Sequence, residues 1–277
     1  MMVMMAGLAA SARELPVHCP EDTVKINSIL AALKASGGTA ADRMVLAAEA
    51  LVGAGLDDYY ATDSVAALRI NVDSFTPLMF VNNVVALAKA SDNPGVVDWH
   101  TFAREFEDIS TRRGEFTGFP SIMYHSSDWI GDNMARGNIV ELTENYPGVV
   151  ARTKSLDEMT RMRKDFAALA DSATFESVRM TEMGFRTHRV PSLKKETIKK
   201  KELTADLQNG DIILLVPNRD GIDIYDMGIL KIEDGALRFI HLDPRSKQVV
   251  KESEDLARYM GLMTKYFQGY RILRLRF

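Results

Sequence analysis

The spacing of apolar residues changes along this chain, from a helical period in the first two-thirds to short β-like runs in the last third. This spacing predicts helices over 22–35, 40–51, 78–90, 99–109 and 153–170. It predicts strands over 211–216, 222–232, 237–242, 247–250 and 270–277, joined by short turns such as the hairpin signal Glu233-Asp-Gly235. Helices followed by sequential strands predict an α+β fold with a mainly antiparallel sheet.

The segment 78–90 (LMFVNNVVALAKA) has apolar residues on nearly every helical face, which predicts a helix buried on most sides. Thr76 is a favourable N-cap and Pro77 a favourable first helical residue. The free N–H groups and positive dipole of a helix start can stabilise a thiolate or an oxyanion. Pro77, however, has no reactive atom and no N–H to donate. The sequence therefore predicts a helix start that could activate a nucleophile, but the nucleophile itself is absent.

Composition excludes several classes of protein. The 277 residues are 46% hydrophobic and 26% charged, as in folded globular domains. Lys and Arg number 34 against 38 Asp and Glu, a net charge of −4, so we expect no nucleic-acid partner. The single cysteine, Cys19, excludes an internal disulfide and a Cys-rich zinc site. No two of the five histidines have metal-ligand spacing and no cofactor motif occurs, so we expect no metal and no cofactor.

The first twelve residues (MMVMMAGLAASA) form a short apolar run that ends in an A-x-A pattern directly before Arg13. This pattern predicts a signal peptide over 1–12, an exported protein of the periplasm or cell envelope, and one domain over 13–277. The alternative is that these residues begin the first helix. No other run approaches about 18 apolar residues, so we expect no integral membrane segment.

Several motifs occur in an order typical of one bacterial family. They are 68–71 (LRIN), 76–88 (TPLMFVNNVVALA), 125–133 (HSSDWIGDN), 209–213 (NGDII), 221–228 (GIDIYDMG) and 240–243 (IHLD). Together they resemble the N-acetylmuramoyl-L-alanine amidase-like family of Bacteroides-type bacteria. That family is similar to the NlpC-type, papain-like cysteine peptidases and amidases of cell-wall turnover. The resemblance implies a papain-like fold in which a buried helix packs on the sheet.

The resemblance also implies where a catalytic site would lie. The nucleophilic Cys of the family falls on Pro77, the catalytic His on Asp226, and the orienting polar residue on His241. A glutamate of the motif falls on Asn82, and an expected arginine on Ile122. We therefore expect Pro77 at a helix start, with Asp226 and His241 on neighbouring strands facing it, and no intact catalytic set.

Five further residues are candidates for a ligand groove. Tyr59 or Tyr60 matches an upstream tyrosine of the family, and Asn133 belongs to the matched 125–133 segment. Trp129 beside Asp128 suits a glycan or peptide ligand. The alternative is that Trp129 is a core residue and Asp128 a helix cap, because aromatic side chains are mostly buried.

Three functional hypotheses follow. The first is an inactive relative of the cell-wall amidases that acts as a binding or scaffold protein for peptidoglycan-derived peptides or for a protein partner. The second is an active amidase or peptidase with a displaced catalytic constellation. The third is a structural protein whose cleft is filled. An open cleft beside Pro77 would favour binding, and a filled one would favour the structural hypothesis.

Overall fold

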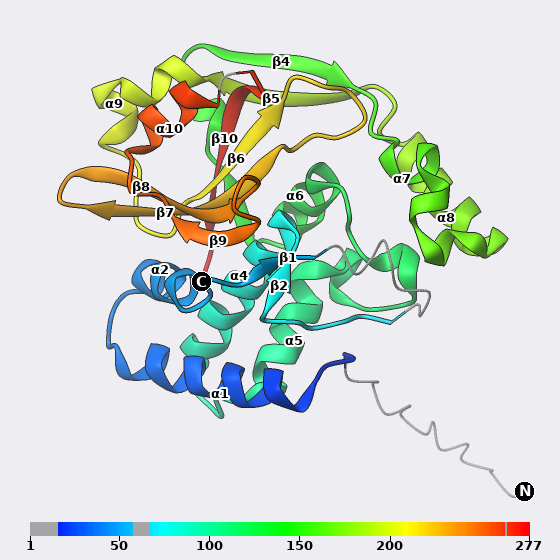
Figure 1. Ribbon diagram of the computed structural model, residues 1–277, viewed down its shortest axis with the longest axis horizontal. Coiled ribbons are helices and arrows are strands. Elements are labelled where there is room, and N and C mark those ends of the chain that lie inside the picture. Colours follow the sequence, from blue (N-terminus) through cyan, green and yellow to red (C-terminus); the bar gives the residue numbers. More distant parts are fainter. Residues whose placement is uncertain (1–15, 58–66, 264) are drawn as a thin grey trace, which may run out of the picture.

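In the computed structural model, which describes residues 16–57, 67–263 and 265–277, a mainly antiparallel ten-stranded sheet separates two groups of helices (Figure 1). The strands are β1 (Gly55–Leu56), β2 (Ser74–Phe75), β3 (Ile139–Glu141), β4 (Val149–Lys154), β5 (His188–Lys194), β6 (Ile212–Pro217), β7 (Asp226–Glu233), β8 (Ala236–Asp243), β9 (Gln248–Lys251) and β10 (Phe267–Leu275). They follow the order β2-β1-β9-β8-β7-β6-β10-β5-β4, and β3 also pairs with β10. The predicted α+β class is confirmed.

Helices pack on both faces of the sheet. They are α1 (Pro20–Ala35), α2 (Ala40–Ala50), α4 (Pro77–Asp92), α5 (Trp99–Ser110), α6 (Ser126–Ala135), α7 (Glu158–Arg161), α8 (Ser172–Met183), α9 (Lys201–Thr204) and α10 (Leu256–Leu262). Helices α1, α2, α4 and α5 gather on one face, and α9 and α10 lie on the other (Figure 1). No helix among the described residues is long and apolar enough to cross a membrane.

Helix α4 is the centre of the larger core. It begins at Pro77, as predicted, and the Thr76 hydroxyl caps it by accepting a hydrogen bond from the Met79 N–H at 3.4 Å. Every residue from Leu78 to Ala88 is buried. The helix packs against Met227 and Ile229, the side chains that β7 directs to this face.

The opposite face of β7 and β8 packs on α10. Because strand side chains alternate, Leu230 and Phe239 leave the α4 face and join a second core with Tyr259 and Met260. The β7–β8 hairpin turns where the sequence predicts it, through Asp234 at φ 52° and Gly235 at φ 78°. Positive φ at both turn residues is typical of a tight hairpin, and glycine adopts it without steric cost.

One predicted helix, over 153–170, is wrong. This stretch begins in β4, which pairs with β5 from Val149 opposite Leu193 to Lys154 opposite His188. It continues through the single turn of α7 and short 3-10 turns, and the regular helix, α8, starts only at Ser172. Asp171 caps α8 by accepting from the Thr174 N–H at 2.8 Å. Pairing with a strand distant in sequence outweighs local helical spacing.

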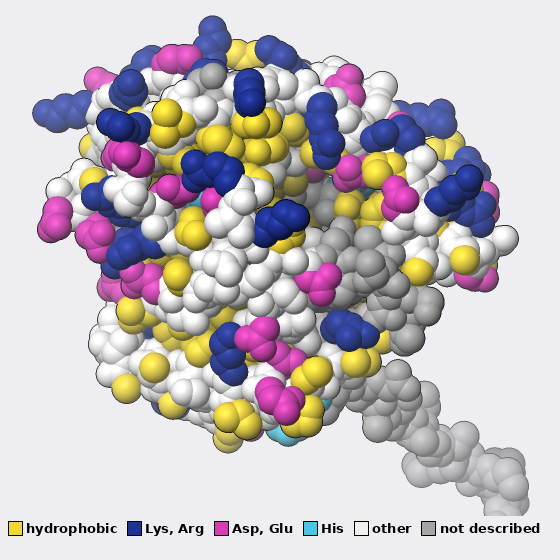
Figure 2. All heavy atoms as spheres, viewed as in Figure 1, with side chains coloured by type: hydrophobic (Ala, Val, Ile, Leu, Met, Phe, Trp, Pro, Cys, Tyr) yellow, Lys and Arg dark blue, Asp and Glu magenta, His cyan; other side chains and the backbone are white. Residues whose placement is uncertain are grey.

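Charged side chains of both signs are mixed over the surface in view (Figure 2). This mixture agrees with the small net charge of −4.

Candidate functional site

A cavity of about 300 Å³ opens beside the start of α4. Thr76, Pro77 and Asn82 form its wall on the α4 side, and Ile122 lies in a loop that also lines it. Three positions at which the resemblance leads us to expect other residues, Pro77, Asn82 and Ile122, thus border one space. The remaining lining includes Ser110, Tyr124, His125, Ser126, Glu158, Arg219, Asp223 and Tyr225. Side chains of the described residues therefore do not fill the space beside Pro77.

Pro77 is the first residue of α4, as the sequence predicts, and it places no nucleophilic atom at the helix start. A thiol amidase needs a thiolate here, activated by an imidazole. Proline offers neither a nucleophilic atom nor an N–H. Cys19, the one thiol in the sequence, is exposed, lies just before α1 and does not line this cavity.

His125, on the cavity wall, forms a buried pair with Glu182, which lies behind the wall. His125 is 5% exposed and Glu182 3% exposed, and Nε2 of His125 lies 2.8 Å from Oε1 of Glu182. Burial lowers the pKa of His125, but the hydrogen bond to Glu182 and the charges of Asp223 and Glu182 outweigh it and raise the pKa overall. The imidazole therefore favours its protonated form more than a free histidine does.

Glu182 also holds one side of the cavity in place. Its carboxylate accepts from the backbone N–H groups of Met159 and Thr160, each at 3.0 Å, and from the Thr160 hydroxyl. These bonds tie α8 to the start of α7, whose Glu158 lines the cavity. Behind His125 lies a side chamber of only about 20 Å³, room for about one water, bordered by Arg112, Asp128 and Glu182.

The predicted groove residues separate in the structure. Trp129 is fully buried, so the core interpretation is confirmed. Asp128 borders the side chamber, where it pairs with Arg112 instead of capping α6. Tyr59 and Tyr60 lie outside the described residues.

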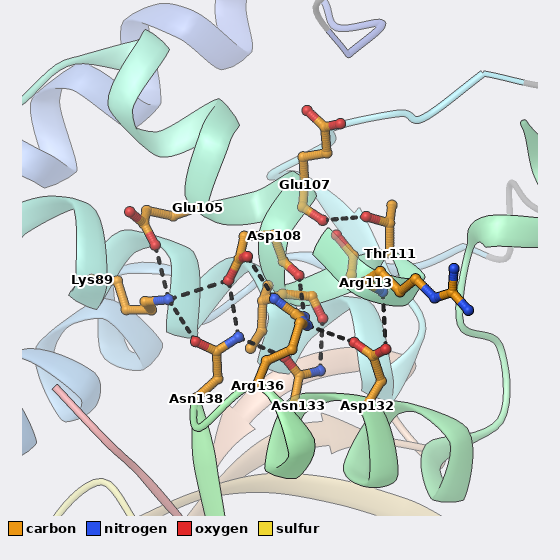
Figure 3. A network of polar contacts seen from close by, with 12 residues as sticks. Lys89, Glu105, Glu107, Asp108, Thr111, Arg113, Asp132, Asn133, Arg136 and Asn138 are labelled. Carbon is orange, nitrogen blue, oxygen red and sulfur yellow. Dashed lines mark hydrogen bonds and ion pairs between the residues drawn. The ribbon is translucent and has the colours of Figure 1, made fainter. Parts of the chain in front are cut away.

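Asn133 is not a groove residue, and the prediction that placed it there is wrong. It is fully buried in a polar network that joins α5 and α6 (Figure 3). Its Nδ2 donates to the carbonyls of Ile109 and Trp129, each at 3.0 Å. Its Oδ1 accepts from Arg136 at 2.9 Å and Asn138 at 3.0 Å. Because these bonds already occupy both ends of the amide, Asn133 connects the helices and has little capacity left for a ligand.

Asp226 and His241 are neighbours, but the expectation that both face Pro77 is wrong. His241 lies opposite Gly228 in the β7–β8 register, and Asp226, two residues before Gly228, shares its face of β7. The side chains of Asp226 and His241 therefore turn to the α10 face, away from α4. His241 Nδ1 lies 2.6 Å from Asp226 Oδ2, and the Tyr259 hydroxyl donates to the same oxygen at 3.4 Å. Neither Asp226 nor His241 is among the described residues that line the cavity.

His241 is enclosed by acids and aromatic rings. Its Nε2 lies 3.2 Å from Glu252 Oε1, and its ring stacks on Phe239 with centroids 4.4 Å apart. Burial lowers the pKa of His241, but the charge of Asp226 and the hydrogen bonds to Asp226 and Glu252 raise it to about 9. The pair is therefore an internal ion pair of the second core.

His241, Asp243 and Glu252 could by spacing hold a metal ion, since their ligand atoms lie within 4.8 Å of one another. Arg245 already bridges the two acids, donating to Asp243 and to Glu252 at 2.8 Å each. A guanidinium in that position supplies the positive charge that a cation would bring, so this donor set does not fit a metal.

The cavity wall contains polar residues that sequence reasoning missed, among them His125, Ser126 and Asp223, and it also missed the partner Glu182. His125 and Ser126 begin the matched 125–133 segment, so the motif contained a signal for them. Asp223 accepts a hydrogen bond from the Ser127 N–H and joins the start of α6 to the loop before β7. Glu182 gave no signal, because it lies in α8, a helix that the spacing did not predict.

Comparisons with known proteins agree with this architecture. A crystal structure of an N-acetylmuramoyl-L-alanine amidase from Bacteroides uniformis superposes with a TM-score of 0.73 at 22% identity, covering 87% of this chain and all of that one. A Legionella pneumophila protein of the family model DUF1460 superposes with a TM-score of 0.69 at 16% identity, covering 92% and 94%. These likenesses establish the fold. A search of curated protein sequences finds no significant match.

The model of the AmiA-like family, described as N-acetylmuramoyl-L-alanine amidase-like, matches residues 56–265. That range contains α4, the cavity-lining loops and most of the sheet. This chain belongs to the AmiA-like, N-acetylmuramoyl-L-alanine amidase-like family.

Proposed function

We propose that this chain is a family member that has lost thiol-amidase chemistry and binds peptidoglycan-derived peptides in the cavity beside Pro77. The main support is that side chains of the described residues do not fill this cavity of about 300 Å³, although the helix beside it begins with proline. A cleft with no remaining task could fill with side chains, whereas a mixed apolar and polar cavity suits a small ligand.

Two positions support the proposed loss of hydrolysis. Pro77 supplies no nucleophile at the helix start. Asp226, at the position that matches the family's histidine, turns to the other face of the sheet and cannot serve as a base for the cavity. Removal of a nucleophile alone costs about 10⁶-fold in rate in a well-studied hydrolase.

The test combines turnover and binding on the same purified protein. N-acetylmuramoyl-peptide fragments are incubated with it and followed by chromatography, and their binding is measured by calorimetry. We expect binding without hydrolysis above background. Turnover would overturn the loss of activity, and absence of both would favour a structural or protein-partner role.

A second candidate, hydrolysis by a displaced constellation, is favoured by one observation. His125 on the cavity wall, with Glu182 bonded behind it, has the form of a base oriented by an acid. If turnover is found, His125→Gln should abolish it while Cys19→Ala leaves it unchanged. Turnover that persists in His125→Gln would exclude this candidate.

We further propose that the protein is exported, on the apolar run and A-S-A pattern of residues 1–12. Mass spectrometry of the protein from its native host should find a chain that begins near Arg13. Recovery of intact Met1 in a cytosolic fraction would contradict export.

A further inference from the structure

Two neutral side chains in the cavity wall are buried, and each has a polar atom without a hydrogen-bond partner among the described residues. Asn82 of α4 is 4% exposed and Ser126 at the start of α6 is 1% exposed, and both line the cavity. Neither Oδ1 of Asn82 nor Oγ of Ser126 has a hydrogen-bond partner within the described part of the chain. Burial of such atoms is unfavourable unless something else satisfies them.

Charged groups around the same cavity, in contrast, each have a partner within the chain. Arg219 donates to Glu158 at 3.4 Å, and His125 bonds Glu182. Asp223 accepts from the Ser127 backbone. The buried wall atoms that lack a partner among the described residues therefore belong to neutral groups, an amide oxygen that accepts and a hydroxyl that both donates and accepts.

We infer that Asn82 and Ser126 bind a neutral amide of the ligand, with the ligand N–H donating to Asn82 Oδ1 and its carbonyl accepting from the Ser126 hydroxyl. A secondary amide presents this pair of groups, one donor and one acceptor. A carboxylate or an ammonium presents only one kind. This inference rests on the proposed function and adds the chemical group that the cavity selects.

Asn83 provides a matched control on the same helix. It follows Asn82, it is fully buried, and its Oδ1 also lacks a partner among the described residues, but it does not line the cavity. Its Nδ2 donates to the Met79 carbonyl at 2.9 Å. Substitution of Asn83 therefore tests general damage to α4 without touching the ligand.

The experiment measures calorimetric affinity for N-acetylmuramoyl-L-alanyl-D-isoglutamine and for its analogue with an ester in place of the lactyl–alanine amide. For the amide we expect Asn82→Leu to raise Kd about tenfold and Ser126→Ala about fivefold, with Asn83→Leu within about twofold of wild type. Wild type should prefer the amide over the ester about tenfold, and Asn82→Leu should lose most of that preference.

The outcomes separate the two claims. If wild type binds the amide while Asn82→Leu and Ser126→Ala bind it as tightly and keep the amide preference, the inference is overturned and the proposed function stands. If wild type binds neither compound, the proposed function fails and the inference with it. Thermal melting checks that each variant is folded, and Ser126→Ala, which removes one oxygen, keeps the test decisive if Asn82→Leu unfolds.

Discussion

Two buried histidine–carboxylate pairs lie among the described residues, and they differ in what surrounds them. His125 stands on the wall of the cavity beside Pro77, and Glu182 bonds it from behind that wall. His241 and Asp226 lie on the other side of the sheet, where Phe239 and Tyr259 pack on the imidazole with ring centroids 4.4 and 5.0 Å away. The residues that resemble a catalytic pair in sequence are enclosed in a core, and the pair beside the cavity comes from elements that the sequence did not connect.

This difference predicts opposite consequences of substitution. A charge pair enclosed in a core contributes to folding, and breaking it leaves an uncompensated charge. A pair on a cavity wall also affects the shape and electrostatics of the space that a ligand enters. Substitutions in each pair therefore test that contrast.

The largest effect is expected for Asp226→Ala. His241 would lose the acid that lies 2.6 Å from its Nδ1, with both side chains at most 1% exposed. We expect the free energy of unfolding to fall by about 4 kcal/mol, since one partner of a buried pair is removed. Urea denaturation measures the loss, and calorimetry should find muramyl-dipeptide affinity within about threefold of wild type. A tenfold loss of affinity in a folded variant would place Asp226 in the binding site.

The pH dependence of stability should reveal the same pair. The pKa of His241 is about 9 in the folded protein, compared with 6.5 for a free histidine. Because the folded value is raised, the stabilisation is fully present below pH 6.5 and is lost as the pH rises through 9. We expect a loss of roughly 3 kcal/mol over this window. Denaturation at a series of pH values measures it.

His241→Gln is the control for that slope. This variant should be less stable at pH 6 and should lose most of the dependence on pH between 6.5 and 9. An equally steep slope in His241→Gln would assign the titration to another group, such as His125, whose pKa is also raised.

The smallest change in stability is expected for Glu182→Gln on the cavity side. Glutamine keeps the shape but weakens the bonds to the Met159 and Thr160 N–H groups and to His125. We expect a loss of about 1–2 kcal/mol in unfolding free energy and a Kd for muramyl dipeptide raised about fivefold, because α7 and His125 are less firmly held. If binding is unchanged while stability falls, the two histidine pairs have the same purely structural role.

Much of the architecture was predictable because local patterns and packing agree. The apolar residues of 78–90, with Thr76 and Pro77 before them, specify a capped and buried α4 with little reference to the rest of the chain. The turn at Asp234 and Gly235 likewise fixes the β7–β8 hairpin. Pro77, Asn82 and Ile122, where the resemblance leads us to expect other residues, all border one cavity.

The sequence by itself determined the class of fold, the family and the absence of a thiol at the start of α4. Tertiary structure alone decided which face of the sheet receives Asp226 and His241, because strand register sets the direction of every side chain and a motif match does not include it. It also decided that Glu182 bonds His125, 57 residues away in the sequence. Likewise it decided that the Asn133 amide is fully hydrogen-bonded between helices. Contacts of this range arise only when distant elements pack, so no local pattern contains them.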